Sequence, residues 1–239
     1  SSTINITDNS NIKSKENIEF NIDTKNIVQD SSVAQGYGGI ALTKNTSNRT
    51  YKSNSEINIT NADIKSGKDL GFNIVSLMQD GRAAGGDSIA YSGKGGGFIA
   101  KNELQLTNNL TQSAILNVVN SKVGAAEDVV ITESTSSQWK QKTDSNASGF
   151  VAIPKGNNTL NVTNNNTIDV DNKSRLYSGA QLVMNLDSTN DLSVEAHSNA
   201  RHFGGKDPVA KSYLELIVNN KLNNNGEIDG GNLLDINFM

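Results

Sequence analysis

The sequence predicts an all-β fold in which the chain coils as a β-solenoid. Short alternating apolar and polar tetrapeptides return about every 50 residues, and 35 of the 239 residues are Asn while only 5% are aromatic. A regular period of this size indicates stacked supersecondary units. Such a stack needs only a narrow aliphatic core, which suits a composition so poor in aromatic residues. We expect one solenoid segment over residues 1–239.

The first element of each repeat is a tetrapeptide. "INIT" at 4–7 recurs at 57–60, and degenerate copies follow as "LQLT", "LNVT" and "LELI". The pattern is typical of a half-buried strand, and it predicts five degenerate repeats that start near 4, 57, 104, 160 and 214. The residues expected to face inward are Ile4, Ile6, Ile57, Ile59, Leu104, Leu106, Leu160 and Val162, and those expected to face outward are Asn5, Asn58, Gln105 and Asn161.

Two further elements recur in the repeats. A second alternating stretch follows at 18–22, 70–74, 114–118, 182–186 and 234–238, and a glycine-rich turn with a short apolar strand occurs at 38–45, 96–102 and 148–157. Asn tolerates left-handed backbone at corners, and stacked Asn side chains form hydrogen-bonded ladders.

The repeat length predicts the size of the coil. A repeat of about 50 residues is too long for one turn of a β-helix and long enough for two. We therefore predict two coils of about 25 residues per repeat. The chain would then form nine or ten coils, a rod about 45 Å long at the usual strand spacing. The stretches 76–95, 124–148 and 187–213 depart most from the pattern and are expected to decorate the rod.

Composition excludes several classes of protein. The chain has no Cys, which excludes a disulfide scaffold or a thiolate metal site. No apolar run approaches the roughly 20 residues of a membrane span, so we expect no membrane insertion by this segment. The net charge of -4, with mixed signs along the chain, argues against nucleic acid as a partner. The repeat pattern is cut at both ends, so we expect a fragment of a longer protein, whose remainder would be a partner.

Trp139 is the one candidate binding residue. It is the only Trp, and it lies in the polar stretch "ESTSSQWKQKTDS". An exposed indole would offer a large, rigid contact area to a glycan or a protein. The alternative is a structural indole that folds back against the flank of the solenoid.

The remaining motifs predict no catalytic residue, cofactor or metal. His197 and His202 are five residues apart and would need a further ligand such as Asp207 to hold a metal ion, so solvated histidines are the simpler interpretation. The glycine clusters lack the Lys-Ser/Thr ending of a phosphate loop. The acidic stretch 169–172 matches neither an EF-hand loop nor the glycine-rich calcium repeat.

The stretch "GGIALTKNTSNRTYKSNSEINITNADIKSGKDLGFNI" at 38–74 resembles the repeat unit of large filamentous adhesins of Gram-negative bacteria, above all the leukotoxin-type adhesins of fusobacteria. Ile64, Ser66, Gly67 and Leu70 stand at the matching places. The resemblance implies a right-handed parallel β-helix that is secreted by a two-partner or autotransporter-like route, is displayed at the outer membrane or released, and acts in cell adhesion and virulence. No catalytic residues come with it.

Three functions follow as hypotheses. The first is a non-enzymatic segment of a secreted surface adhesin or leukotoxin-like protein, a shaft that binds a host-cell or bacterial surface receptor, either protein or glycan. The second is a polysaccharide-active β-helix enzyme, either a lyase or a glycoside hydrolase, which would need a groove lined by carboxylates and aromatic residues. The third is a purely structural spacer.

Overall fold

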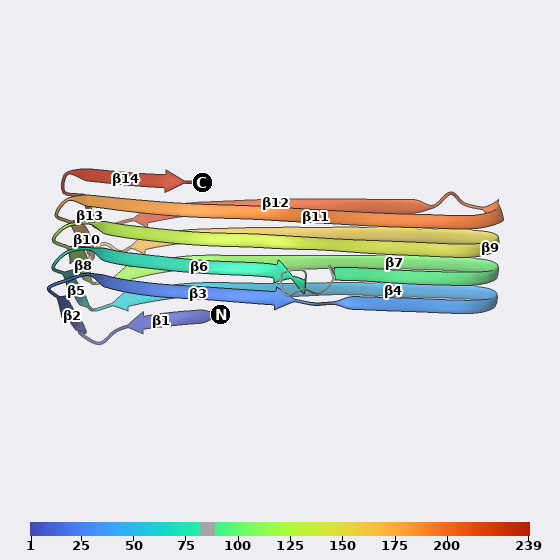
Figure 1. The fold of residues 1–239 in the computed structure, drawn as a ribbon, viewed down its shortest axis with the longest axis horizontal. Helices are drawn as coiled ribbons and strands as arrows, with labels where there is room; N and C mark the ends of the chain where they lie inside the picture. Colours follow the sequence, from blue (N-terminus) through green and yellow to red (C-terminus); the bar gives the residue numbers. More distant parts are fainter. Residues whose placement is uncertain (82–88) are drawn as a thin grey trace.

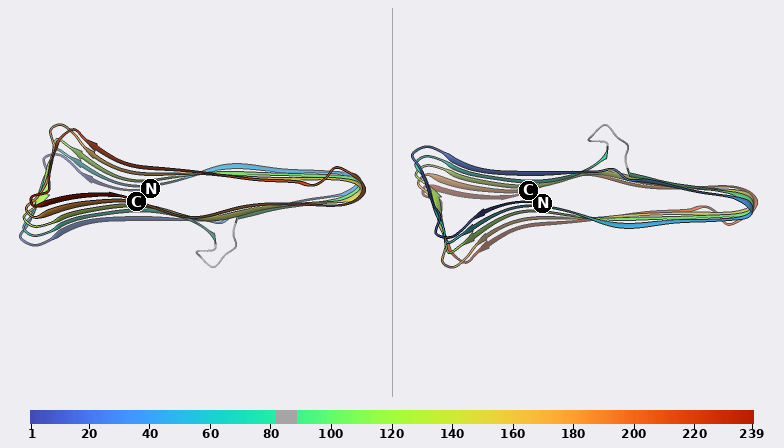
Figure 2. Two further views of the ribbon diagram at one scale, coloured as in Figure 1. Left: turned by 90° about the horizontal axis from the view of Figure 1, so that it is seen from above. Right: turned by 90° about the horizontal axis from the view of Figure 1, so that it is seen from below.

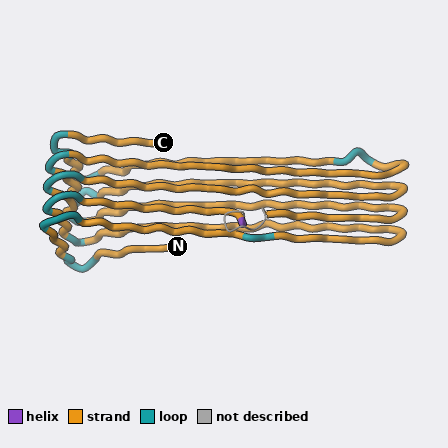
Figure 3. The backbone as a smooth tube through the Cα atoms, viewed as in Figure 1, coloured by secondary structure: helices purple, strands orange, loops and turns teal. Residues whose placement is uncertain are grey.

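The computed structural model describes residues 1–81 and 89–239, and strands fill most of both ranges, which confirms the all-β prediction (Figure 1). Short loops join the strands, most of them at one end of the molecule (Figure 3). The strands are β1 (Ser2–Ile6), β2 (Asn11–Ser14), β3 (Ile18–Val28), β4 (Ser31–Thr60), β5 (Asp63–Ser66), β6 (Leu70–Asp80), β7 (Ile89–Val119), β8 (Lys122–Ala125), β9 (Val129–Val170), β10 (Arg175–Ser178), β11 (Gln181–Gly205), β12 (Val209–Asn224), β13 (Glu227–Asp229) and β14 (Leu233–Phe238).

The strands pair in parallel, and each pair joins one repeat to the next. Ile4 pairs with Ile57, Ile57 with Leu116, and Leu116 with Ile168. The chain therefore returns beside itself once per repeat, after a circuit of 53, 59 or 52 residues in these three steps. The prediction of two coils per repeat is wrong. The stack consequently holds about half the predicted coils, and its longest dimension lies along the strands rather than across them (Figure 1).

The circuit is long because its polar middle part is also strand. In β9, the inward side chains of Thr135, Ser137 and Gln141 are fully buried, although the sequence around them is polar. Backbone pairing continues through these positions, with β11 following β9 from Leu182 to Gly205. Most of 124–148 and 187–213 is therefore paired strand and not decoration. The third predicted decoration, 76–95, is strand at both ends, while 82–88 lie outside the described residues.

The register confirms part of the predicted repeat alignment and corrects the rest. "INIT" at 4 lies beside "INIT" at 57, and "LNVT" at 160 lies beside "LELI" at 214, as predicted. However, Ile57 pairs with Leu116 and not with Leu104, which pairs instead with Asn45 and Gly156. Leu160 pairs with Asn108, so the tetrapeptides occupy three different positions on the circuit. The second alternating stretch of the third repeat is likewise 129–133, which pairs with 70–74 and 182–186, and not 114–118.

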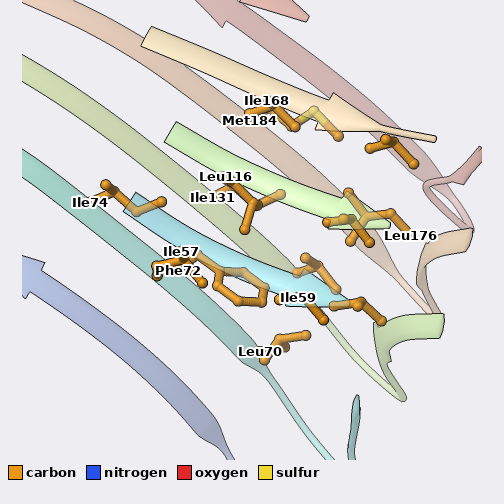
Figure 4. Close-up of a cluster of buried hydrophobic side chains, with 14 of the residues drawn as sticks. Ile57, Ile59, Leu70, Phe72, Ile74, Leu116, Ile131, Ile168, Leu176 and Met184 are labelled. Atoms are coloured by element: carbon orange, nitrogen blue, oxygen red, sulfur yellow. The ribbon is translucent and has the colours of Figure 1, made fainter. Parts of the chain in front are cut away.

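The circuit is wide at one end and narrow at the other (Figure 2). Two long layers, both from the nine-stranded sheet of β1, β3, β4, β6, β7, β9, β11, β12 and β14, converge toward the narrow end. The short strands β2, β5, β8, β10 and β13 form a second sheet that closes the wide end. Large aliphatic side chains fill the wide end (Figure 4), whereas Ala100, Ala147 and Ala152 form the core at the narrow end. The smallest inward residues therefore lie where the two layers are closest.

The predicted orientations of the tetrapeptides are confirmed. Seven of the eight expected inward residues are buried, and Ile4, in the first circuit, packs half-buried against the same core. Asn5, Asn58 and Asn117 point outward and form a ladder, in which Asn58 donates to Asn5 at 3.0 Å and Asn117 donates to Asn58 at 2.8 Å. Asn61 and Asn120 adopt positive φ at equivalent corners, as expected of Asn in these turns.

Candidate functional site: the outer surface of the narrow end

Trp139 lies in the interior, so the structure does not support the predicted surface anchor. Its side chain is fully buried, its ring packs against Tyr51 with centroids 5.4 Å apart, and its Nε1 donates to Oε1 of Gln141 at 3.0 Å. The polar residues around Trp139 belong to strand β9, whose alternate side chains face the interior. Trp139 packs there in a cluster that includes Met78, Tyr91 and Leu160. Trp139 is therefore a core residue with a satisfied N–H group.

The two histidines are exposed on β11, and the structure does not bring them together with a third ligand. His197 lies 3.6 Å from a carboxylate oxygen of Glu195, which is also paired with Lys140 at 3.0 Å. Across residues 1–81 and 89–239, no group of three His, Cys, Asp or Glu side chains could hold a metal ion. Asp171, in the acidic stretch 169–172, accepts hydrogen bonds from the backbone of Asn120 and Lys173, which gives it a role in the turn.

The recurring glycine-rich segments at 38–45, 96–102 and 148–157 form the narrow end. Gly38, Gly97 and Gly149 pair in neighbouring circuits, and Ile40, Ile99 and Val151 pair two residues later. A Cβ atom at Gly97 would collide with the carbonyl oxygen of Gly38, and one at Gly149 with that of Gly97. Adjacent backbones approach so closely at this reversal that only glycine fits.

The reversal exposes a stack of aromatic side chains, the phenylalanine ladder, which consists of Phe98, Phe150 and Phe203. The rings of Phe98 and Phe150 are parallel with centroids 5.1 Å apart, and Phe203 stacks on Phe150 at 6.4 Å. All three are exposed, Phe203 at 96% of its surface. Ile40 and Leu42 are also exposed on the first circuit. An exposed apolar surface of this kind is a candidate interaction site.

Beside the ladder lies a shallow depression, which we call the tyrosine hollow. Tyr37 is 71% exposed, and its ring lies against Gly96, whose Cα would carry a Cβ only 2.9 Å from Cδ1 of the ring. Because Gly96 has no side chain, the tyrosine ring occupies space that a side chain would otherwise fill. The hollow is lined by Tyr37, Lys94, Gly95, Asn146, Ala147, Ser148, Asn199 and Arg201.

Two columns of residues run along the stack and form the hollow. Lys94, Asn146 and Asn199 pair in one column, and Tyr37, Gly96, Ser148 and Arg201 pair in the other. Residues in one column lie on adjacent strands, which are about 4.8 Å apart. The hollow therefore extends across four circuits, roughly 15 Å along the stack. Arg201 also lines an adjoining depression with Phe150 and Phe203, so the hollow and the ladder form one continuous surface.

The surface is basic at the hollow. The nearby carboxylates of Asp144 and Glu195 are paired with Lys142 at 3.2 Å and Lys140 at 3.0 Å. In contrast, no carboxylate of the described residues forms an ion pair with Lys94 or Arg201. The hollow thus presents two cations without a carboxylate partner, two amides, two hydroxyl groups and one aromatic ring.

The sequence pointed to Trp139 and missed this surface. Tyr37, Lys94 and Arg201 are 57 to 164 residues apart in the chain, and only the register brings them together. The usable signal was a phenylalanine next to glycine, because "GGF", "SGF" and "HFGG" put three phenylalanines at the same reversal. No helix in the described residues is long and apolar enough to cross a membrane. No protein-family model, curated protein or solved structure matches this chain.

Proposed function

We propose that this chain is a non-enzymatic segment of a secreted bacterial surface adhesin or leukotoxin-like filamentous protein. In this proposal its parallel strands form a right-handed β-helix, a rigid shaft whose narrow end attaches to a cell surface. The observation that carries the proposal is the contrast between Asn ladders elsewhere on the outer surface and the exposed aromatic and basic surface at the narrow end.

The β-helix form is supported by the register. Strands one repeat apart pair in parallel over almost the whole circuit, and two layers of one sheet face each other across a buried interior. Right-handed connections between parallel strands are strongly preferred in proteins. A stack of this kind gains stability from each added circuit and so suits a shaft.

The chemistry of the narrow end favours attachment over the two alternative functions. The enzyme alternative needs a groove lined by carboxylates, and the residues that line the tyrosine hollow include no Asp or Glu. A structural spacer needs no exposed aromatic ladder, because exposed phenylalanines add a risk of aggregation.

The proposal is tested by adding the fluorescently labelled chain to leukocytes and epithelial cells. We expect saturable binding that the unlabelled chain competes away. An unrelated β-solenoid protein without exposed aromatic residues, labelled in the same way, is the control for nonspecific attachment. If no saturable binding occurs at micromolar concentrations, the spacer hypothesis replaces ours.

A further inference from the structure

We infer that the tyrosine hollow binds an acidic saccharide, a sugar chain that carries carboxylate or sulfate groups. This inference rests on the proposed role in attachment and names the class of ligand. It is carried by three features of the hollow that occur together: an aromatic face, two cations without carboxylate partners, and amide groups placed between them.

The aromatic face suits a sugar ring. The Tyr37 ring lies against Gly96 at one edge and is 71% exposed, so most of the ring is presented to solvent. The face of an aromatic ring carries negative partial charge, and the C–H groups on one face of a pyranose carry positive partial charge. A sugar can therefore pack on Tyr37 without burying its hydroxyl groups.

The cations select for an acidic sugar. Lys94 and Arg201 lie on opposite columns of the hollow and form no ion pair with the carboxylates of the described residues. Arg pairs with carboxylate and sulfate groups through parallel hydrogen bonds, whereas Lys acts as a point charge. Between them, Asn146 and Asn199 offer amide donors and acceptors for hydroxyl groups. A neutral sugar would leave both cations unused.

The shape favours a chain over a small molecule. The hollow is shallow and continues across four circuits along the stack, whereas small-molecule sites are concave and bury most of their ligand. An extended oligosaccharide can contact Tyr37 in the first circuit and Arg201 in the fourth.

The experiment measures binding of the whole chain to two matched pairs of probes by calorimetry or biolayer interferometry. Sialyllactose is compared with lactose for the carboxylate, and dextran sulfate with dextran for the sulfate. Polyglutamate serves as an acidic polymer without sugar. We expect one or both acidic saccharides to bind more tightly than their neutral counterparts and than polyglutamate, and the pair that responds identifies the acidic group.

The variants are Tyr37→Ala, Gly96→Ala and Lys94→Ala, with Lys44→Ala as the charge-matched control. Tyr37 is exposed, so its removal leaves the core intact, and a Cβ at Gly96 displaces the tyrosine ring without removing it. Lys44 is an exposed lysine that does not line the hollow. We expect losses of about tenfold or more in affinity for the first three variants, equivalent to removal of one anchoring contact, and no change for Lys44→Ala. Thermal unfolding of each variant confirms that it is folded.

Three results would overturn the inference: equal binding of acidic and neutral sugars, equal binding of polyglutamate, or affinity unchanged in folded Tyr37→Ala. Cell binding separates this failure from failure of the proposed function. If the chain binds cells saturably and neither acidic saccharide competes, the proposed role in attachment is supported and the inference of an acidic saccharide ligand is wrong.

Discussion

Glu133 is the residue that departs most from its surroundings. It pairs with Ile74 in one neighbouring circuit and with Leu186 in the other, and all three side chains are fully buried. Neither carboxylate oxygen has a hydrogen-bond partner of normal geometry. Burial raises the pKa of Glu133 well above its ordinary value, and the backbone groups of Leu116 and Thr167 oppose the shift only in part. The structure therefore favours a protonated, neutral Glu133.

This raised pKa predicts a loss of stability as pH rises. In the unfolded chain Glu133 releases its proton near pH 4.3, whereas the folded chain holds the proton to higher pH. Between these two pKa values the folded state binds more protons, so the free energy of unfolding falls as pH rises from about 4.3 through the folded pKa. The contribution of Glu133 is thus fully present only below the unfolded pKa.

We predict that Glu133→Leu stabilises the protein. At pH 7 the free energy of unfolding should rise by about 1–3 kcal/mol, the usual cost of an unsatisfied buried polar group, and the gain should be smaller at pH 4. Urea unfolding at both pH values measures this difference. Glu215→Leu, a change at an exposed carboxylate on β12, is the control. A gain that is the same at both pH values would show that Glu133 is not the titrating group.

At the scale of the element, the narrow-end reversal depends on its column of glycines. We predict that Gly97→Ala destabilises the chain by about 1–3 kcal/mol, because its Cβ would meet the backbone oxygen of Gly38 and the circuits would have to separate. Gly39→Ala is the matched control, because the new Cβ has open space around it. Thermal unfolding of both variants gives the comparison. Equal midpoints for the two variants would contradict a close-packed reversal.

The elements that the sequence predicted well are those whose side chains alternate between apolar and polar. The inward Ile57 and Ile59 with the outward Asn58 could be assigned from period two alone. The glycine-rich echo was also located correctly, because close backbone approach restricts the residue type. The reversal carries the same residues in three circuits, so its signal survives without any alignment.

The elements that the sequence missed lie where inward positions are polar. Gln141 accepts hydrogen bonds from Asn108 and Trp139 and donates to the carbonyl oxygen of Thr159, all in the interior. The sequence predicts loops for such strands, because buried Asn and Gln residues cannot be distinguished in a sequence from exposed ones. The circuit therefore appeared half as long as it is. For the same reason Trp139 looked exposed, and the candidate binding surface, which is assembled from four circuits, was missed.

At the scale of the whole molecule, burial is set by position in the stack. A side chain in a middle circuit is covered from both sides, whereas one in the first circuit is covered from one side only. Phe20 and Phe72 form a natural pair for testing this, since they hold the same place in neighbouring circuits and their rings stack with centroids 5.2 Å apart. Phe72 is 1% exposed, and Phe20 packs half-buried against the same core.

The pair gives a prediction about the stack as a unit. We expect Phe72→Ala to lower the free energy of unfolding by about 3–5 kcal/mol, the usual cost of deleting a buried phenylalanine. Phe20→Ala should cost clearly less, because less apolar surface is lost from the interior. In a stack whose circuits contact only their neighbours, a defect in the middle also uncouples the circuits on either side. Urea unfolding of Phe72→Ala should then separate into two transitions or lose steepness, while Phe20→Ala keeps one transition. Equal losses of stability and a single sharp transition in both variants would show that the chain unfolds as one closed core, with no dependence on the order of its circuits.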